Sequence, residues 1–309
     1  MPVRPRDDGA PAAGAAVGAA VGAAVGAAVV PSSPMGRFDR MGDNTFVAGQ
    51  EPWLERLGNL RNVVRQEMVT RQLAAHLPRG PLRVLDVGAG QGTQALRLAR
   101  LGHSVTAVEP DGRMRAAFEQ AAAGLTPEQR EHVTLVATDL AGLASVTRPT
   151  AYDVVMCHGV LMYLPESRAA VAGLARRVAP GGIVSIAARN GDAMAWRPAG
   201  RHDWPAALAA LDEMRRAAEE GRDARYRNEI GVDARADTLA SLTADCEAAG
   251  LEVTAWYGIR VASDDVPVDE PAPTGVELAA LLDVEERLGA SDPYRALGTL
   301  LHVIARRRA

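Results

Sequence analysis

The 309-residue sequence predicts an α/β protein with a Rossmann-like, seven-stranded, mostly parallel sheet, helices on both faces, an N-terminal helical cap and a lid insertion after strand 5. Three observations predict this class. Short apolar runs alternate with amphipathic segments of about ten to fifteen residues, which is the pattern of βαβ units in a parallel sheet. The run "LRVLDV" leads into "GAGQGT", a loop of the kind that joins a strand to a helix beside a ligand. The alternation stops over residues 190–235 and then resumes, which indicates an insertion.

The first half of the chain supplies the cap and five strands. Residues 53–77 carry apolar side chains at helical spacing and form the predicted cap. The strand over residues 82–87 is almost continuously apolar, as expected for a strand buried on both faces of a parallel sheet. The elements that follow are helix 93–102, strand 104–109, helix 112–123, strand 133–138, strand 152–158, helix 167–178 and strand 183–188.

The second half supplies the insertion and two more strands. Residues 190–235 carry a charged helical stretch, predicted over residues 207–226, and are too long for an ordinary connection, so we interpret them as a lid. The pattern then predicts helix 237–250, strand 252–261, helix 275–289 and strand 299–306.

The N-terminal residues differ from the rest of the chain. Residues 1–34 contain the repeat "AAGAAVGAAVGAAVGAAVV", in which a glycine at every fourth position would cost a helix roughly 1 kcal/mol each. The run resembles a signal peptide in length but lacks the large apolar side chains that favour insertion. We expect a disordered tail before one domain over residues 35–309, with Met35 as an alternative start of the protein.

Composition limits the possible chemistry. The net charge is -4 and the isoelectric point is about 5.9, so no global positive field favours a polyanionic partner. Every basic residue other than histidine is arginine, which excludes Schiff-base, phosphate-loop and Ser–Lys chemistry. Cys157 and Cys246 are far apart and lack the spacing of metal ligands. We expect two reduced thiols in a cytoplasmic protein, no metal and no membrane association.

The glycine-rich loop distinguishes among nucleotide cofactors. A dinucleotide fingerprint needs a third glycine at its sixth position, which here is Thr93, and a phosphate loop needs a lysine. The acid Asp86 directly precedes Gly88 and Gly90; it would repel a pyrophosphate but suits a cationic amino group. Glu109 ends the next strand, where a carboxylate can hold both ribose hydroxyls. A ribose without phosphate and with a cationic amino-acid end describes S-adenosylmethionine.

Two residues after the third strand extend this site. Asp139 can accept a hydrogen bond from the adenine amine, and Leu140 can pack on the ring. The alternatives are structural: Asp86 and Asp139 could each cap a following helix, and Glu109 could be a surface acid. All four side chains follow successive strands, and ligands of open α/β sheets bind at that edge.

With "ATDL" after strand 3, "YDVVMCHGVLMYL" on strand 4 and "APGG" before strand 5, residues 53–190 resemble the class I S-adenosylmethionine-dependent methyltransferases. A closer resemblance is to the bacterial tRNA 5-carboxymethoxyuridine methyltransferases. It lies in "LGNLRNVVRQ", "CHGVLMYL", "AARNGDA", "YGIRV" and "DPYRALGTLLHVIARR", and covers residue 53 to the C-terminus apart from the lid.

The resemblance implies roles for individual residues. By position, Arg61 would contact the methionine carboxylate, and His158 would line the cofactor pocket. Gly88, Ala89 and Glu109 would hold the methionine and ribose ends of the cofactor. The structural alternatives to these cofactor contacts are a solvated arginine at position 61 and a hydrogen-bonded core histidine at position 158.

The lid departs from that family's pattern, so the acceptor stays open between tRNA and a small molecule. The family carries a lysine-rich basic run there, whereas this chain mixes acids and arginines. A solvated helix face is one interpretation of that mixture. A local phosphate-binding patch is the other, and its candidate residues are Arg215, Arg216, Arg222, Arg225, Arg227 and Arg235.

The expected reaction is methylation of a carboxylate oxygen, which is ionised at pH 7 and needs no general base. Arg260 is the expected acceptor-orienting residue, because a guanidinium pairs bidentately with a carboxylate. Tyr163, Asn190 and Tyr294 could complete the acceptor pocket. A small-molecule O- or N-methyltransferase is the alternative, and a non-catalytic methyltransferase-like binding module is a remote one. The sequence does not indicate the oligomeric state.

Overall fold

The computed structural model describes residues 55–228 and 230–308. The expectations for the tail over residues 1–34, and for Met35, lie outside these residues.

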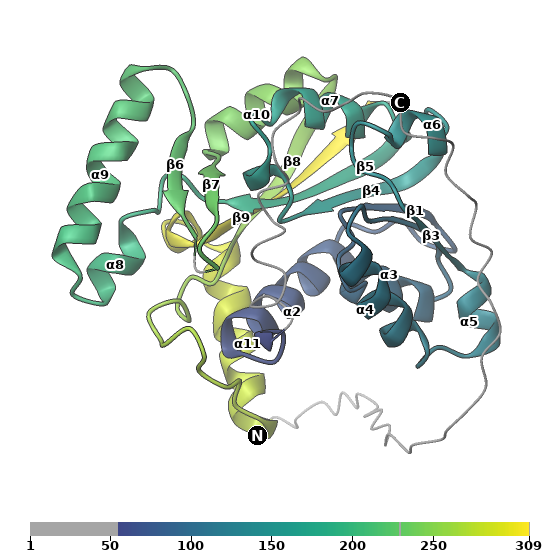
Figure 1. The fold of residues 1–309 in the computed structure, drawn as a ribbon, viewed down its shortest axis with the longest axis horizontal. Helices are drawn as coiled ribbons and strands as arrows, with labels where there is room; N and C mark the ends of the chain where they lie inside the picture. The colour runs from purple at the N-terminus through teal and green to yellow at the C-terminus, as the bar shows by residue number, and fades with distance from the viewer. Residues whose placement is uncertain (1–54, 229, 309) are drawn as a thin grey trace, which may run out of the picture. The chain divides into compact units, whose positions relative to one another are not determined.

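A single seven-stranded sheet in the order β3-β2-β1-β4-β5-β9-β8 organises the fold (Figure 1). Its strands are β1 (Arg83–Val87), β2 (Ser104–Val108), β3 (Val133–Val136), β4 (Tyr152–His158), β5 (Val178–Arg189), β8 (Leu251–Ile259) and β9 (Leu300–Arg307). The first five strands pair in parallel, and β9 alone runs antiparallel to both of its neighbours. The predicted seven-stranded, mostly parallel sheet is confirmed.

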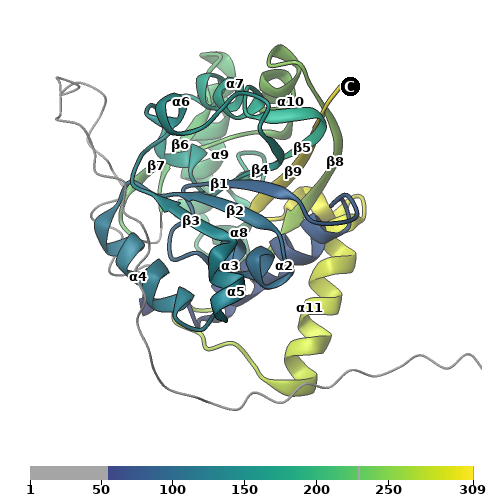
Figure 2. The ribbon, with the colours of Figure 1, turned by 90° about the vertical axis from the view of Figure 1, so that its right-hand side faces the viewer.

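Helices cover both faces of the sheet (Figure 2). One face packs α6 (Leu143–Val146), α7 (Arg168–Ala175) and α10 (Leu239–Ala248). The other face packs α2 (Leu60–Ala74), α3 (Thr93–Arg100) and α4 (Gly112–Ala122), with α5 (Pro127–Glu131) and α11 (Gly275–Ala290) on the same side. Each face has its own apolar core, which is why β1 and β4 are buried on both sides.

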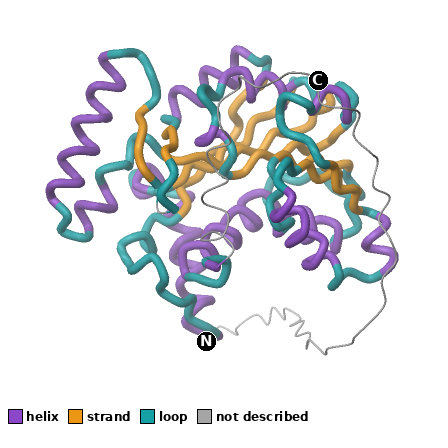
Figure 3. Tube along the Cα trace, in the orientation of Figure 1, coloured by secondary structure: helices purple, strands orange, loops and turns teal. Residues whose placement is uncertain are grey.

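The insertion is built differently from the helix predicted over residues 207–226. It contains α8 (Trp196–Gly200), α9 (Trp204–Glu219) and a hairpin of β6 (Ala224–Arg227) and β7 (Asp233–Ala236), the separate pair of strands in Figure 3. The helix ends earlier than predicted because Gly221 turns the chain with φ 62°, a left-handed conformation that suits glycine. No helix of the described chain is long and apolar enough to cross a membrane.

Candidate functional site

The carboxyl ends of β1 to β5 meet at one edge of the sheet because these strands are parallel and in register. Asp86 lies near the end of β1, Glu109 follows β2, Asp139 follows β3 and His158 ends β4. Since β9 is antiparallel, its beginning lies at this edge too, beside the end of β8 and Arg260. The fold therefore brings the residues singled out in the sequence to one side of the molecule.

The loop between β1 and α3 can be built only with glycine. Gly88 and Gly92 have φ of 73° and 85°, in the left-handed region. A Cβ at Gly88 would lie 2.3 Å from Val160 Cγ2, and one at Gly92 would lie 2.5 Å from Phe118 Cδ2. The loop backbone therefore packs directly against the side chains of Val160 and Phe118, an approach that only glycine permits at these two positions.

Two buried acids flank that loop. Glu109 Oε2 accepts a hydrogen bond from Gly90 N at 2.8 Å, and Oε1 accepts one from Asp111 N at 3.0 Å. Burial, followed by the neighbouring charge of Glu109, raises the pKa of Asp86 to about 7, while a hydrogen bond from the Ala95 backbone opposes this rise. Asp86 thus contacts the first turn of α3, as the capping alternative proposed, yet it remains a buried acid beside the glycine loop.

The expected adenine-binding residues lie in a turn after β3. Asp139 is exposed and its Oδ1 accepts a hydrogen bond from Gly142 N at 2.8 Å, so this oxygen closes the turn. Leu140 is half-buried and packs against the core beneath α7. Both roles toward adenine stay predictions.

His158 lies at the end of β4, and only one of its two ring nitrogens forms a hydrogen bond within the described chain. Its Nε2 is 2.8 Å from Ser185 Oγ, while its Nδ1 is buried without a hydrogen-bond partner in the described chain. Burial, followed by the charges of His302 and Arg65, holds the pKa of His158 well below its usual value. The neutral ring therefore has one buried nitrogen available for a further hydrogen bond.

Arg61 is 1% exposed, and its guanidinium donates to the backbone oxygens of Asp264 and Val266. Arg65, one turn further along α2, donates to the backbone oxygen of His158 at 3.3 Å and lies against Gly159, whose added Cβ would be 2.3 Å from Arg65 Nη2. Contact between Arg61 and the cofactor carboxylate stays a prediction. Arg65, which the sequence did not single out, lies at the end of β4.

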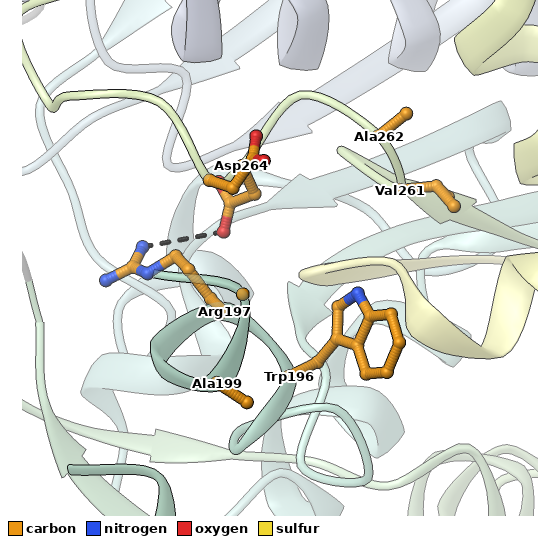
Figure 4. A pocket seen from close by; sticks show the side chains of 8 residues that line it. Trp196, Arg197, Ala199, Val261, Ala262 and Asp264 are labelled. Carbon is orange, nitrogen blue, oxygen red and sulfur yellow. Dashed lines mark ion pairs between the residues drawn. The ribbon is translucent and has the colours of Figure 1, made fainter. Parts of the chain in front are cut away.

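Several arginines lie close to the carboxylate of Asp264 at this edge of the sheet. Asp264 Oδ1 is 2.9 Å from Arg260 Nε and 3.7 Å from Arg61 Nε, and Asp264 Oδ2 is 3.5 Å from Arg197 Nη1. We call Arg61, Arg197, Arg260 and Asp264 the arginine cluster. Three guanidinium groups thus lie within 4 Å of this one carboxylate. Figure 4 shows the Arg197–Asp264 pair beside Trp196, in a cavity of about 360 Å³.

The buried Nε of Arg260 makes no contact beyond its ion pair with Asp264 in the described chain, and the buried Nε of Arg189 makes no hydrogen bond there. Arg260 has φ 58°, an uncommon conformation for a residue with a side chain, and no hydrogen bond to its guanidinium is found within residues 55–228 and 230–308. Arg189 Nη1 donates to Thr299 O, while its Nε is buried without a partner there, and its guanidinium carbon lies 5.3 Å from the centre of the Tyr226 ring. Burial lowers the pKa of both Arg189 and Arg65, that of Arg65 to about 10.

The remaining predicted acceptor residues lie in different settings. Burial raises the pKa of Tyr163, whose hydroxyl accepts a hydrogen bond from Asn228 in the lid. Asn190 is 1% exposed, and its amide donates to the backbone oxygens of Ala296 and Gly298, which anchors the segment before β9. Tyr294 is 49% exposed. Their contacts with an acceptor stay predictions.

The lid arginines are largely neutralised by neighbouring acids. Arg235 is buried and pairs with Asp223 and Asp237. Four more form ion pairs: Arg215 with Asp212, Arg216 with Glu213, Arg222 with Glu213 and Glu220, and Arg227 with Asp233. Of the six candidates, Arg225 alone has no ion pair within the described chain. The lid thus presents little uncompensated positive charge to phosphates.

These features fit S-adenosylmethionine. A closely packed glycine loop, a buried acid beside it, a carboxylate at the end of β2 and an imidazole nitrogen without a hydrogen bond in the described chain match a nucleoside with a ribose diol and a cationic amino group. Within the described residues, no group of three His, Cys, Asp or Glu side chains is arranged to hold a metal ion.

Comparisons with known proteins agree with this geometry. Residues 85–184 match the family described as a methyltransferase domain. The tRNA 5-carboxymethoxyuridine methyltransferase of Escherichia coli (strain K12) is 27% identical over 253 residues, which span 81% of this chain and 89% of that protein. The ubiquinone biosynthesis O-methyltransferase of Dinoroseobacter shibae is 30% identical over 203 residues, 57% of this chain and 78% of that protein. The magnesium protoporphyrin IX methyltransferase of Synechocystis PCC 6803, solved with bound SAH, shares the fold with a TM-score of 0.52 at 16% identity, covering 85% of this chain and 97% of that one.

Proposed function

We propose a reaction for this chain, which belongs to the class I S-adenosylmethionine-dependent methyltransferases: transfer of the cofactor's methyl group to a carboxylate oxygen of the acceptor. The arginine cluster carries the proposal. Asp264 faces three guanidinium groups there, and Arg65 and Arg189 add positive charge beside them. An acceptor carboxylate would pair with guanidinium groups at this edge, whereas a neutral phenol or amine would not.

The chain's own residues have two tasks in this reaction. Glu109 and the backbone of the glycine loop would hold the cofactor, which supplies a methyl group activated by its sulfonium when bound. Arg260 and Arg189 would orient the acceptor carboxylate, because guanidinium groups pair with carboxylates in a fixed plane. The carboxylate is already ionised at pH 7, so no general base is needed. Alignment of the two reactants can supply roughly 7–11 kcal/mol.

Two acceptors are candidates. The E. coli relative supports the 5-carboxymethoxyuridine of tRNA, since the similarity spans 89% of that protein. The ion-paired lid arginines favour a small carboxylic acid, since they leave few charges for an RNA backbone. Both candidates share the chemistry of a carboxylate acceptor.

One experiment tests the reaction and separates the acceptors. The protein is incubated with cofactor carrying a tritiated methyl group, and with either bulk tRNA or a small-molecule extract. Methyl esters hydrolyse in alkali, so we expect the transferred label to be released as volatile methanol at high pH. Label that resists alkali on both acceptors would exclude the carboxylate proposal. The fraction that carries the label identifies the acceptor class.

A further inference from the structure

A chain of side-chain hydrogen bonds runs through the sheet to His158. His158 Nε2 is 2.8 Å from Ser185 Oγ, which is 2.8 Å from His302 Nε2, and His302 Nδ1 is 2.8 Å from Gln72 Oε1. Gln72 ends the chain by donating from Nε2 to the backbone oxygen of Gly258 at 3.3 Å. Ser185 and His302 are fully buried and Gln72 is 4% exposed, so water cannot replace these contacts.

The direction of every hydrogen bond follows from the Gln72 end. Because its amide nitrogen donates to Gly258, its oxygen must accept from His302 Nδ1–H. Burial lowers the pKa of His302 to about 3, so the ring is neutral and its Nε2 accepts from the Ser185 hydroxyl. Ser185 Oγ is then left to accept from His158 Nε2–H.

The consequence for His158 is a single tautomer. With the proton on Nε2 of a neutral ring, Nδ1 carries only a lone pair, and it is buried without a donor in the described chain. A buried acceptor without a donor is unfavourable, so a ligand that supplies a donor to Nδ1 binds more tightly. At the methionine end of the cofactor, beside Asp86 and the glycine loop, the α-ammonium group is such a donor.

We propose that Gln72, Ser185 and His302 are positioning residues that fix the His158 tautomer, so that Nδ1 accepts a hydrogen bond from the α-ammonium group of bound S-adenosylmethionine. This inference rests on the cofactor and not on the identity of the acceptor. It would stand if the methyl group proved to be transferred to an amine or a phenol.

Cofactor binding provides a readout that does not involve methyl transfer. Calorimetry with S-adenosylhomocysteine should show affinity reduced roughly three- to tenfold in Ser185→Ala and in His302→Phe. The control is His76→Phe, which removes a partly buried histidine just after α2 that contacts Tyr257 and lies outside the chain of hydrogen bonds. Methylthioadenosine, which lacks the amino-acid end, should bind all three variants as it binds the natural chain. Equal losses for both ligands, or none for either, would overturn the proposal.

Two further measurements keep the proposal testable if a variant fails to fold. A ¹⁵N spectrum of the histidine rings in the natural chain should place the His158 proton on Nε2; a proton on Nδ1 contradicts the proposal. His158→Asn puts an amide oxygen near the position of Nδ1, so it should retain affinity and become insensitive to Ser185→Ala. A full loss on adding Ser185→Ala to His158→Asn would mean that Ser185 acts only on stability.

Discussion

Arg260 combines three properties that rarely occur together at a structural position. It has a left-handed backbone conformation, a guanidinium without hydrogen bonds in the described chain, and a single carboxylate neighbour shared with two other arginines. Strained residues persist where the surrounding structure holds them, often at functional sites. We infer that its terminal nitrogens serve the acceptor.

The kcat/KM of the Arg260→Leu variant should therefore fall by an amount that corresponds to about 2–4 kcal/mol of transition-state stabilisation, with cofactor affinity unchanged. Steady-state kinetics with the acceptor and calorimetry with the cofactor measure the two quantities separately. Arg215→Leu is the control, because Arg215 is an exposed lid arginine paired with Asp212. An intact rate in Arg260→Leu with a neutral acceptor would end both the carboxylate and the tRNA proposals.

The raised pKa of Asp86 leads to a second prediction, which concerns how the stability of the fold depends on pH. Its pKa is raised in the folded chain to about 7, so folding favours the protonated form, and stability is lost as pH rises from about 4 through 7. Asp86→Asn should therefore melt at a higher temperature than the natural chain at pH 8, with little difference at pH 4, and should bind the cofactor more weakly.

Asp153→Asn is the opposite control for that measurement. Arg83 hydrogen-bonds the Asp153 carboxylate and lowers its pKa, so its contribution to stability is present above the unfolded pKa and is lost in acid. This variant should melt at a lower temperature at pH 8. If both variants shift in the same direction at pH 8, burial of a charged Asp86 is not the cause.

Local sequence was enough to place the acids and glycines of the site. Asp86 lies at the end of β1, and Gly88 and Glu109 directly follow β1 and β2, so each is defined by its strand, and the parallel sheet then brings them together. The arginine cluster was not visible in the same way. Its members come from α2, the lid and the segment after β8, so their approach depends on how those elements pack. Arg260 was predicted from its strand, but no local pattern marks Asp264 as its partner.

The β1–α3 loop is the element on which the proposed cofactor site depends. Gly92 and Gly102 have nearly the same φ, 85° and 84°, yet an added Cβ meets Phe118 at Gly92 and open space at Gly102. Gly102→Ala thus measures the cost of the left-handed conformation alone, about 1 kcal/mol. Gly92→Ala should cost 1–3 kcal/mol more because Phe118 is buried and cannot withdraw freely.

Urea unfolding of the two variants gives the comparison. Similar losses of stability in both variants would mean that Phe118 moves aside without a cost.

The strands were easier to predict than their order in the sheet. β9 lies between β5 and β8 because antiparallel pairing joins segments that are distant in the sequence, and no local periodicity encodes that pairing.

For the whole molecule, composition makes a prediction that the described residues do not test. A chain shortened to begin at Met35 should stay soluble and keep its melting temperature within about 2 °C, because the Ala/Gly/Val repeat offers few large apolar side chains to a core. Calorimetric melting of the full and shortened chains decides this. A large drop in the shortened chain would show that the repeat packs against the domain.

Asp264 also has a consequence for turnover. If the acceptor is a carboxylic acid, as proposed, it must compete for Arg260 with the carboxylate of Asp264, which already lies 2.9 Å away. Esterification removes the charge from the acceptor but leaves the charge of Asp264 intact. The neutral ester then forms no ion pair with the guanidinium groups, and Asp264 can pair with them again. We expect weak product inhibition by the ester as a result, because the reaction discharges the group by which the acceptor was held.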